Sequence, residues 1–525
     1  MKRRDVLRAG IAALAMPAVA RAAGPTTLRF VPQADLAVLD PIATPAFVTH
    51  NHGYMVFDTL YGVDDAFVAH PQMAEGHTVE DDGKTWRITL RDGLRFHDGE
   101  PVRARDVVAS LNRWGRRDTY GTDLVAATDE LSAPSDRVVQ FRLKKPFPTL
   151  PDLLGKAGTN MPCIMPERLA GTDPMKPLAE MVGSGPFRFV AAERVPGDRV
   201  VYEKFAGYVP RPQGQVDFLS GPKIANVDRV EWHVIPDPST AAAALQSGEV
   251  DWWEQPTTDV LPLLRRNPEL SVEVQDKSGF LGVLRLNHLQ PPFDNPAIRR
   301  ALFPAIDQAD FMTAVAGTDR SMWRDGIGFI TPGPMASDAG MTALTGPRSR
   351  DAARQALKDG GYKGEKVVLM TPTDFASINA MSLVAEDCLR GIGMNVEMQS
   401  TDWGTVVQRF NNKGPLDKGG WSALCVYTTG AVTNNPADHR LLRAQGEKGG
   451  VYGWPSSPRI EALRTAYLDA DSTDARKTIC RDLQLQAFQD VPFIPLGIFY
   501  QPTAARKSVT GILQGFPLFY NLRLG

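Results

Sequence analysis

Residues 74–102 read AEGHTVEDDGKTWRITLRDGLRFHDGEPV. Within this stretch the apolar side chains of Trp86, Ile88 and Leu90 alternate with polar ones, which is the period-two pattern of a half-buried strand. The Asp-Gly pairs at 92–93 and 98–99 each predict a tight turn. The segment therefore predicts a strand that leads into two closely spaced turns.

Similar patterns extend the prediction through the first half of the chain. An amphipathic helix begins near Ala104, and one stripe of it carries Val107, Val108, Leu111 and Trp114. Alternating strands follow at 139–143 and 230–234. Asp237-Pro238 then begins another helix as its N-cap and first residue, and Gly248 ends it. This half of the chain is a mixture of strands and helices.

After residue 280 the elements alternate regularly. A strand over 281–286 precedes a helix that Asn295-Pro296 begins. Strands at 367–370, 394–398 and 422–427 then alternate with helices, one over 377–389 and one that Asp402 caps. Strands and helices that alternate in this way predict a parallel sheet with right-handed crossovers. Such sheets bind ligands beyond the carboxyl ends of their strands, which here lie near Met370, Ser400 and Tyr427.

The N-terminus has the features of an export signal. Arg3-Arg4 precede an apolar run over 9–20, which is too short to span a bilayer, and small residues at 18, 20 and 22 fit a cleavage site. The paired arginines resemble a twin-arginine signal, and an ordinary secretory signal is the alternative. The first cysteine is Cys163, so we expect no lipid anchor. A soluble periplasmic protein is predicted.

Size and charge limit the classes of function. The chain has 525 residues, more than one hydrophobic core usually organises, so two or more lobes are expected. Loss of residues 1–22 removes five basic residues and one acidic residue, which moves the net charge from −2 to −6. A mildly acidic protein is not expected to bind nucleic acid or an anionic membrane. The four scattered cysteines could form a disulfide, but buried thiols are the favoured interpretation.

No catalytic signature is present in the sequence. It has no H-E-x-x-H motif and no Walker loop, and Gly183-Ser184-Gly185 lacks the spacing of a nucleophilic serine motif and predicts a structural turn. His50 and His52 could offer two imidazoles to a metal, but no cluster of further ligands completes a site. We expect them to be ordinary surface or helix-capping histidines, and we expect neither a cofactor nor a bound metal.

Several aromatic residues fall at strand exits or helix starts, where ligand clefts are formed: Trp252, Trp253, Trp403, Trp421, Tyr427 and Trp454. Each could line a cleft or pack in a core. Trp252 and Trp253 are adjacent on a strand, so their side chains face opposite ways and at most one needs to enter the same core.

The stretch at 74–102, with its continuation over 104–111, resembles the signature of family 5 of the bacterial extracellular solute-binding proteins. Other matches follow in the family's order at 39–41, 183–187, 248–251, 287–293 and 298–302. That family includes receptors for dipeptides, oligopeptides, nickel complexes, opines and oligosaccharides. The resemblance covers essentially the whole mature chain.

The resemblance implies an α/β fold of the two-lobed, type II periplasmic binding protein class, with an extra subdomain in the first lobe. We expect a signal peptide over 1–22, lobe one over 23–279, lobe two over 280–494, and a return segment to lobe one over 495–525. The hinge crossings should lie near Gly279–Leu281 and Phe493–Leu496. Ligand would be sealed between the lobes by hinge closure and delivered, by a monomeric receptor, to the permease subunits of an ABC importer.

One position departs from the peptide receptors of the family. In those receptors the sequence just after a lobe-two strand resembles aromatic-x-x-Asp. The resemblance implies that this aspartate holds the peptide's amino group. Here the stretch reads Tyr427-Thr428-Thr429-Gly430. An ammonium group buried without a partner costs several kcal/mol, so Asp438 or Glu254 would have to replace the missing acid, or the ligand is not a peptide.

The candidate ligand-binding residues, from strand exits and family position, are Tyr427, Asn434, Trp253, Glu254, Phe47 and Asn160. The aromatic side chains would enclose the ligand, and the asparagines would orient it by hydrogen bonds. Two other classes compete with a non-enzymatic receptor. They are an exported enzyme such as a hydrolase, and a metal or haem carrier that uses His50 and His52.

Overall fold

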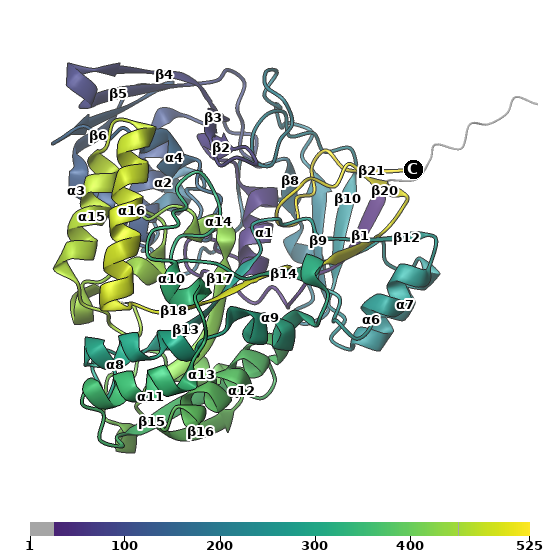
Figure 1. Ribbon diagram of the computed structural model, residues 1–525. Coiled ribbons are helices and arrows are strands. Elements are labelled where there is room, and N and C mark those ends of the chain that lie inside the picture. Colours follow the sequence, from purple (N-terminus) through teal and green to yellow (C-terminus); the bar gives the residue numbers. More distant parts are fainter. Residues whose placement is uncertain (1–25, 450) are drawn as a thin grey trace, which may run out of the picture.

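The computed structural model describes residues 26–449 and 451–525. The predicted signal peptide and its cleavage sites lie outside these residues. The described chain forms an α/β molecule built on two large sheets, one at the right and one toward the bottom of Figure 1. This is the predicted α/β class.

The first sheet has seven strands, drawn from both ends of the chain. Their order is β12 (Leu270–Glu273), β19 (Thr503–Arg506), β11 (Trp252–Trp253), β1 (Thr27–Val31), β10 (Arg229–His233), β9 (Arg199–Lys204) and β8 (Phe187–Phe189). The central strand β1 runs parallel to both β10 and β11. Phe30 on β1 lies among the rings of Trp232, Trp252 and Phe519, so the tail near residue 519 completes this core.

The second sheet has six strands, in the order β14 (Trp323–Arg324), β18 (Ile494–Phe499), β13 (Phe280–Leu286), β17 (Ala423–Thr429), β15 (Lys366–Pro372) and β16 (Asn395–Thr401). β15 is parallel to β16 and β17, and α12 (Ala376–Gly391) and α13 (Trp403–Arg409) connect them. The predicted alternation of strands and helices is therefore confirmed. The sheet as a whole is mixed, because β13 is antiparallel to both β17 and β18.

A smaller sheet contains the stretch that resembles the family signature. Its order is β4 (Ala74–Glu80), β5 (Thr85–Leu90), β7 (Val138–Leu143) and β6 (Thr128–Ser135). Trp86, Ile88 and Leu90 are buried, as their spacing predicted, and α2 (Ala104–Trp114) packs against the sheet. On α2, the guanidinium of Arg113 forms a fully buried ion pair with Asp40, with Nη2 2.6 Å from Oδ2. This pair fixes the helix to the segment that follows β1.

The remaining elements cover these sheets or connect them (Figure 1). The helices are α1 (Phe47–Val56), α3 (Thr119–Ala127), α4 (Leu150–Leu154), α5 (Glu167–Ala170), α6 (Pro238–Ser247), α7 (Leu261–Arg266), α8 (Pro296–Ala301), α9 (Gln308–Ala316), α10 (Thr342–Thr345), α11 (Arg350–Asp359), α14 (Gly430–Thr433), α15 (Pro458–Asp469) and α16 (Thr473–Asp490). Short strand pairs are β2 (Tyr61–Val63) with β3 (Ala69–Pro71), and β20 (Val509–Thr510) with β21 (Arg523–Leu524).

The helix boundaries follow the capping residues that the sequence indicated. The side chains of Asp237, Asn295 and Asp402 each accept a backbone N–H in the first turn of α6, α8 and α13. Gly248 ends α6 in the left-handed conformation, with φ 81°. These local predictions are confirmed.

The chain passes between the two large sheets twice. The first passage lies between β12, which ends at Glu273, and β13, which begins at Phe280. The second lies between β18, which ends at Phe499, and β19, which begins at Thr503. The sequence placed the second passage near Phe493–Leu496, whereas β18 begins at Ile494 and keeps the chain in the six-stranded sheet until Phe499.

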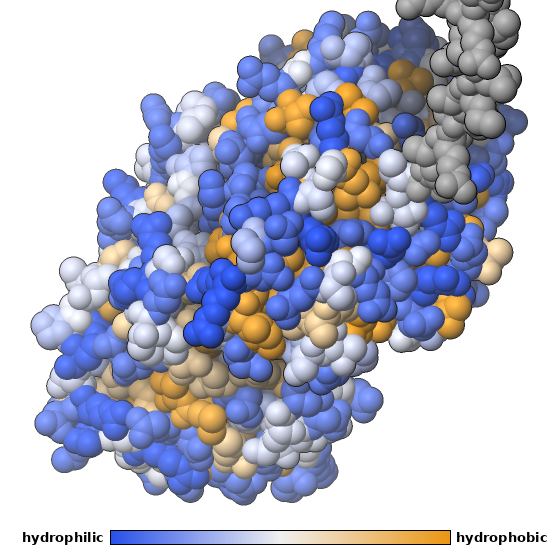
Figure 2. All heavy atoms as spheres, turned by 90° about the vertical axis from the view of Figure 1, so that its right-hand side faces the viewer, coloured by the Kyte–Doolittle hydropathy of each residue, from blue (hydrophilic) through white to orange (hydrophobic). Residues whose placement is uncertain are grey.

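The surface of the molecule is mixed in polarity. On the face at the right of Figure 1, hydrophilic residues are interspersed with apolar patches (Figure 2). Within residues 26–449 and 451–525, no helix combines the length and the apolar character needed to cross a bilayer.

Candidate ligand-binding site

A cavity lies between the two large sheets and is lined from both. Its empty space is about 660 Å³, a value that includes the solvent at its open mouth. The segments after β1 and β11, together with α1, form one wall. The start of β13, the end of β17 and α14 form the opposite wall, and the tail at 515–517 closes one side. We call this space the central cavity.

Two further hollows adjoin the central cavity. One has an empty volume of about 1000 Å³, shares Ala157 and Ala431 with it, and is lined by Asn434 and Asp438. The other has about 1640 Å³, shares Gln33 and Phe280 with it, and includes Tyr427. The central cavity thus has a neighbouring hollow on each of two sides, with which it shares lining residues.

The predicted site residues are distributed unevenly over these hollows. Glu254 and Phe47 line the central cavity. Tyr427 and Asn434 each line one of the adjoining hollows. Trp253 and Asn160 line none of the three.

Trp253 points into a small core with Val31 and Leu245, on the side of the sheet away from the cavity. Its neighbour Trp252 lines the cavity instead, and its indole N–H donates to Thr503 Oγ1 at 2.6 Å. The adjacent tryptophans therefore face opposite sides of the sheet, as their positions on one strand require. Asn160 holds a loop together, because its side chain donates to the carbonyl oxygens of Ile42 and Thr44.

Other lining residues were not found from the sequence. Gln33, Asn51, Asp276, Phe280 and Phe516 come from five separate segments that only the folded chain brings together. The strand exit at Val31 could have indicated Gln33, since polar residues just after a strand often line a site. Nothing local distinguishes Phe516 in the C-terminal tail.

Glu254 is the most unusual side chain of the central cavity. It is buried, with 6% of its surface exposed, and burial raises its pKa to about 7. Its Oε1 accepts a hydrogen bond from Asn51 Nδ2 at 2.9 Å, and its Oε2 accepts one from the Gln33 backbone N–H at 2.8 Å. In the part of the chain that the structure describes, no lysine, arginine or histidine forms an ion pair with it.

The other titratable groups of the cavity do not supply a positive charge. Burial lowers the pKa of His50 to about 4, so its imidazole is neutral at pH 7, and its Nε2 is 3.0 Å from the Ala157 carbonyl oxygen. Asp276 is a second carboxyl in the wall; burial raises its pKa, and its Oδ1 accepts from the N–H and hydroxyl of Ser278. Among the described lining residues there is no lysine or arginine. Any charge that the lining residues carry is therefore negative.

Aromatic rings form much of the apolar wall. The rings of Phe47 and Phe280 meet across the cavity with centroids 5.9 Å apart, and Phe280 packs edge-on against Tyr427 at 5.1 Å. The ring of Phe516 lies 4.2 Å from that of His50. These contacts join α1 to two strands of the six-stranded sheet and to the tail.

Gly430 stands where peptide receptors of the resembled family carry aspartate, and the structure explains the glycine. A Cβ at this position would lie 2.1 Å from the Ser278 carbonyl oxygen. The Gly430 N–H also donates to the Gly279 carbonyl oxygen at 2.8 Å. The start of α14 thus packs directly on the segment that leads into β13, with no room for any side chain.

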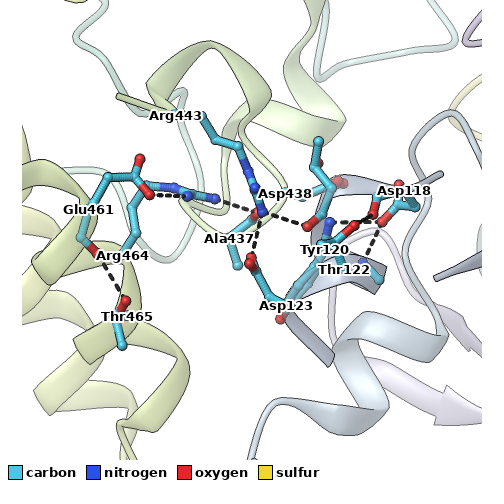
Figure 3. Close-up of polar contacts among 12 residues, drawn as sticks. Asp118, Tyr120, Thr122, Asp123, Ala437, Asp438, Arg443, Glu461, Arg464 and Thr465 are labelled. Carbon is cyan, nitrogen blue, oxygen red and sulfur yellow. Dashed lines mark hydrogen bonds and ion pairs between the residues drawn. The ribbon is translucent and has the colours of Figure 1, made fainter. Parts of the chain in front are cut away.

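Ion pairs join the lobes beside the cavity. Lys156 Nζ lies 2.6 Å from Asp118 Oδ2 and 2.8 Å from Asp438 Oδ1, and all three side chains are buried. Figure 3 shows Arg443 reaching toward α3, where its Nη2 lies 2.7 Å from Asp123 Oδ2. Asp438, one of the two acids considered for ligand binding, is therefore already paired with a lysine.

The motifs considered for catalysis and metal binding have structural roles. The Ser184 hydroxyl donates to the Ile164 carbonyl oxygen, and the flanking Gly183 and Gly185 pack against the backbone that ends α1. His50 and His52 are buried on α1, not exposed as expected, and His52 Nδ1 lies 2.8 Å from the Tyr202 hydroxyl. The described residues contain no cluster of three or more metal-ligating side chains, and all four cysteines are free and buried.

Comparison with known proteins gives consistent results. The family model described as "Bacterial extracellular solute-binding proteins, family 5 Middle" matches residues 68–445. A probable peptide ABC transporter periplasmic-binding protein of Sinorhizobium fredii is 36% identical, and the alignment covers 100% of this chain and 99% of that protein. A glutathione-binding protein of Pectobacterium atrosepticum is 26% identical over 90% of this chain and 88% of its own length.

Solved structures share the two-lobed fold. A periplasmic binding protein from Agrobacterium tumefaciens, in complex with agropinic acid, has a TM-score of 0.79 at 20% identity and covers 95% of this chain and 99% of its own. A dipeptide-binding protein from Pseudoalteromonas, in complex with Met-Leu, has a TM-score of 0.77 at 20% identity and covers 95% and 100%. At these identities the likeness shows the fold alone.

Proposed function

This chain belongs to family 5 of the bacterial extracellular solute-binding proteins, and on that premise we propose that it captures a peptide-like solute between its two lobes for an ABC importer. One observation carries the proposal, namely a cavity whose opposite walls come from the two large sheets. A ligand bound there contacts both lobes, so binding favours the closed arrangement.

The peptide-like class is supported by relatives and by the cavity. The relatives from Sinorhizobium and Pectobacterium are named for peptides and for glutathione, itself a small peptide. The two hollows that adjoin the central cavity would provide further room for an extended solute with several polar groups. Phe47 and Tyr427 would enclose the solute, and Asn434 would orient one end of it.

The two large sheets support a division of the chain into two lobes. We place lobe one at 23–279, lobe two at 280 to about 500, and the return segment after it, since β19 at 503–506 rejoins the seven-stranded sheet. The segments 274–279 and 500–502 then act as the hinge.

Export and delivery complete the proposal. The receptor reaches the periplasm through the twin-arginine route and acts there as a monomer that docks on permease subunits. Replacing Arg3 and Arg4 by lysine tests the route. Loss of the periplasmic form supports it, whereas unchanged export indicates the ordinary secretory route.

A thermal-unfolding screen of the mature protein tests the function. The panel contains di- and tripeptides, glutathione, opine-like amino acid conjugates, oligosaccharides and nickel-histidine. A ligand at 100 times its Kd adds about 2.7 kcal/mol to the free energy of unfolding, a clear shift in the midpoint. Stabilisation by peptides supports the proposal. The proposal is contradicted if no member of the panel stabilises the protein, or if the protein converts a member into a product.

A further inference from the structure

The geometry points to Glu254 as the anion that receives an ammonium group of the solute, inside the central cavity and from the lobe-one side. This inference rests on the proposed function and adds to it a ligand class, namely solutes that carry a free amine. The carboxylate that pairs with the ammonium group would thus belong to the residue just after β11, and not to the residue at position 430.

The carboxylate of Glu254 is positioned but not neutralised. Its two protein hydrogen bonds come from neutral donors, Asn51 Nδ2 and the Gln33 N–H, one to each oxygen. A carboxylate has about four lone-pair sites, so each oxygen keeps capacity for a donor in the cavity. A buried carboxylate without a cation is costly, and a bound ammonium group would remove that cost.

The charge of the lining points to the same ligand chemistry. The described residues around the central cavity include two carboxyl groups, Glu254 and Asp276, and no lysine or arginine. His50, the basic residue of this wall, is held neutral by burial. The hollow that contains Asp438 differs, because Lys156 and Arg476 also line it and balance its acids. The unbalanced negative charge is therefore confined to the neighbourhood of Glu254.

The alternative acids are excluded by their contacts. Asp438 is occupied by Lys156 at 2.8 Å. Position 430 has no space for a side chain, because a Cβ there would meet the Ser278 carbonyl oxygen. Asp276 uses its Oδ1 to cap the turn at Ser278. Glu254 is left as the acid that lacks both a cation and a turn to cap.

The surrounding rings suit a cation as well. Phe47, Phe280 and Phe516 line the same cavity, and the faces of aromatic rings attract ammonium groups, most strongly where water is excluded. An ammonium group paired with Glu254 would thus lie among aromatic rings whose faces attract a cation and disfavour an anion.

Glu254 could instead serve only to tie α1 to the exit of β1 through Asn51 and Gln33. Glu254→Gln separates the two roles, because the amide keeps an acceptor for the Gln33 N–H while losing the charge. Glu249→Gln is the matched control. Glu249 is exposed, lies five residues earlier in the same segment, and undergoes the same chemical change.

The test measures affinity by calorimetry for matched pairs of probes. Each pair is a free-amine solute (Ala-Phe, Met-Leu or glutathione) and its N-acetylated form, or cadaverine and its form acetylated on both amines, with maltotriose and nickel-histidine as solutes of other classes. Wild-type protein should bind free-amine members and reject their acetylated forms. Glu254→Gln should lose about tenfold to a hundredfold in affinity for the same members, and Glu249→Gln should lose none.

Three results would overturn the inference. They are equal binding of the acetylated form, unchanged affinity in Glu254→Gln, and binding only of solutes without an amine. Each of these leaves the receptor function intact, because a solute is still bound. Failure of every probe of every class would count against both the inference and the proposed function.

Discussion

At the scale of single residues, Gly430 and Glu254 account for how the site differs from a peptide receptor with a lobe-two aspartate. The backbone of α14 packs against Ser278 so closely that a side chain is excluded at position 430. The family pattern showed that the acid was missing but could not show why, since Ser278 is 152 residues away in the sequence. Glu254 was found as a candidate from its place after a strand, whereas its lack of a cation required the folded structure.

Gly430→Ala should destabilise the protein by about 1–3 kcal/mol, because the added Cβ collides with the Ser278 carbonyl oxygen. The measurement is the free energy of unfolding in urea. Gly76→Ala is the control, since a Cβ at position 76 meets nothing within 4 Å. Equal stability of the two variants would show that the close approach at Gly430 is absent in solution.

Glu254 should make the ligand-free protein less stable as the pH rises. Its pKa is about 7 in the folded state against 4.5 when exposed, so between these values the folded chain binds more protons at this residue than the unfolded chain. Stability therefore falls through this window and levels off above it. Glu254→Gln lacks this loss, and its stability relative to wild type should increase by about 3 kcal/mol from pH 4.5 to pH 8.

The comparison isolates Glu254, because the groups that face it (His50, Asp276 and Tyr427) are present in both proteins. His50 titrates near pH 4, below most of the window. Urea unfolding at pH 5 and pH 8 is the measurement. A stability difference that does not change with pH would mean that Glu254 is not buried as a carboxylate.

At the scale of elements, the sequence predicted the helices and strands whose formation depends on residues close together in the chain. The strand at 85–90, the helix caps Asp237, Asn295 and Asp402, and the alternation after residue 366 all depend on periodicity or on a side chain within a few residues. The antiparallel placement of β13 and β18 beside the parallel strands was missed. Their pairing joins positions about 200 residues apart, and the local pattern of a buried strand carries no information about its partner.

The docking of α2 depends on one buried ion pair. Arg113→Met should destabilise the protein by about 3–5 kcal/mol, because it leaves Asp40 charged and unpaired in the interior. The double variant with Asp40→Asn should recover part of this loss, since no charge then remains. Unfolding free energies of the single and double variants give the result. Additive losses in the double variant would refute the pairing.

At the scale of the whole molecule, we propose that the ion pairs beside the cavity stabilise a closed arrangement of the lobes. Arg443→Met removes the contact with Asp123 that crosses between them. Ligand affinity should weaken by about tenfold, the usual size of such a coupling, while the thermal midpoint of the ligand-free protein changes little. Arg481→Met, which removes an exposed ion pair with Asp482 inside one lobe, is the control. Equal affinity in both variants would show that Arg443 does not hold the lobes together.

The most direct test of capture between two lobes is small-angle X-ray scattering of the mature protein with and without a bound solute. The ligand-free sample is prepared by unfolding and refolding, which removes any solute carried through purification. With solute, the profile should match the one calculated from the present structure, and without it the radius of gyration should increase as the lobes separate at 274–279 and 500–502. A bound solute that leaves the radius of gyration unchanged, or increases it, would contradict capture by closure of the lobes.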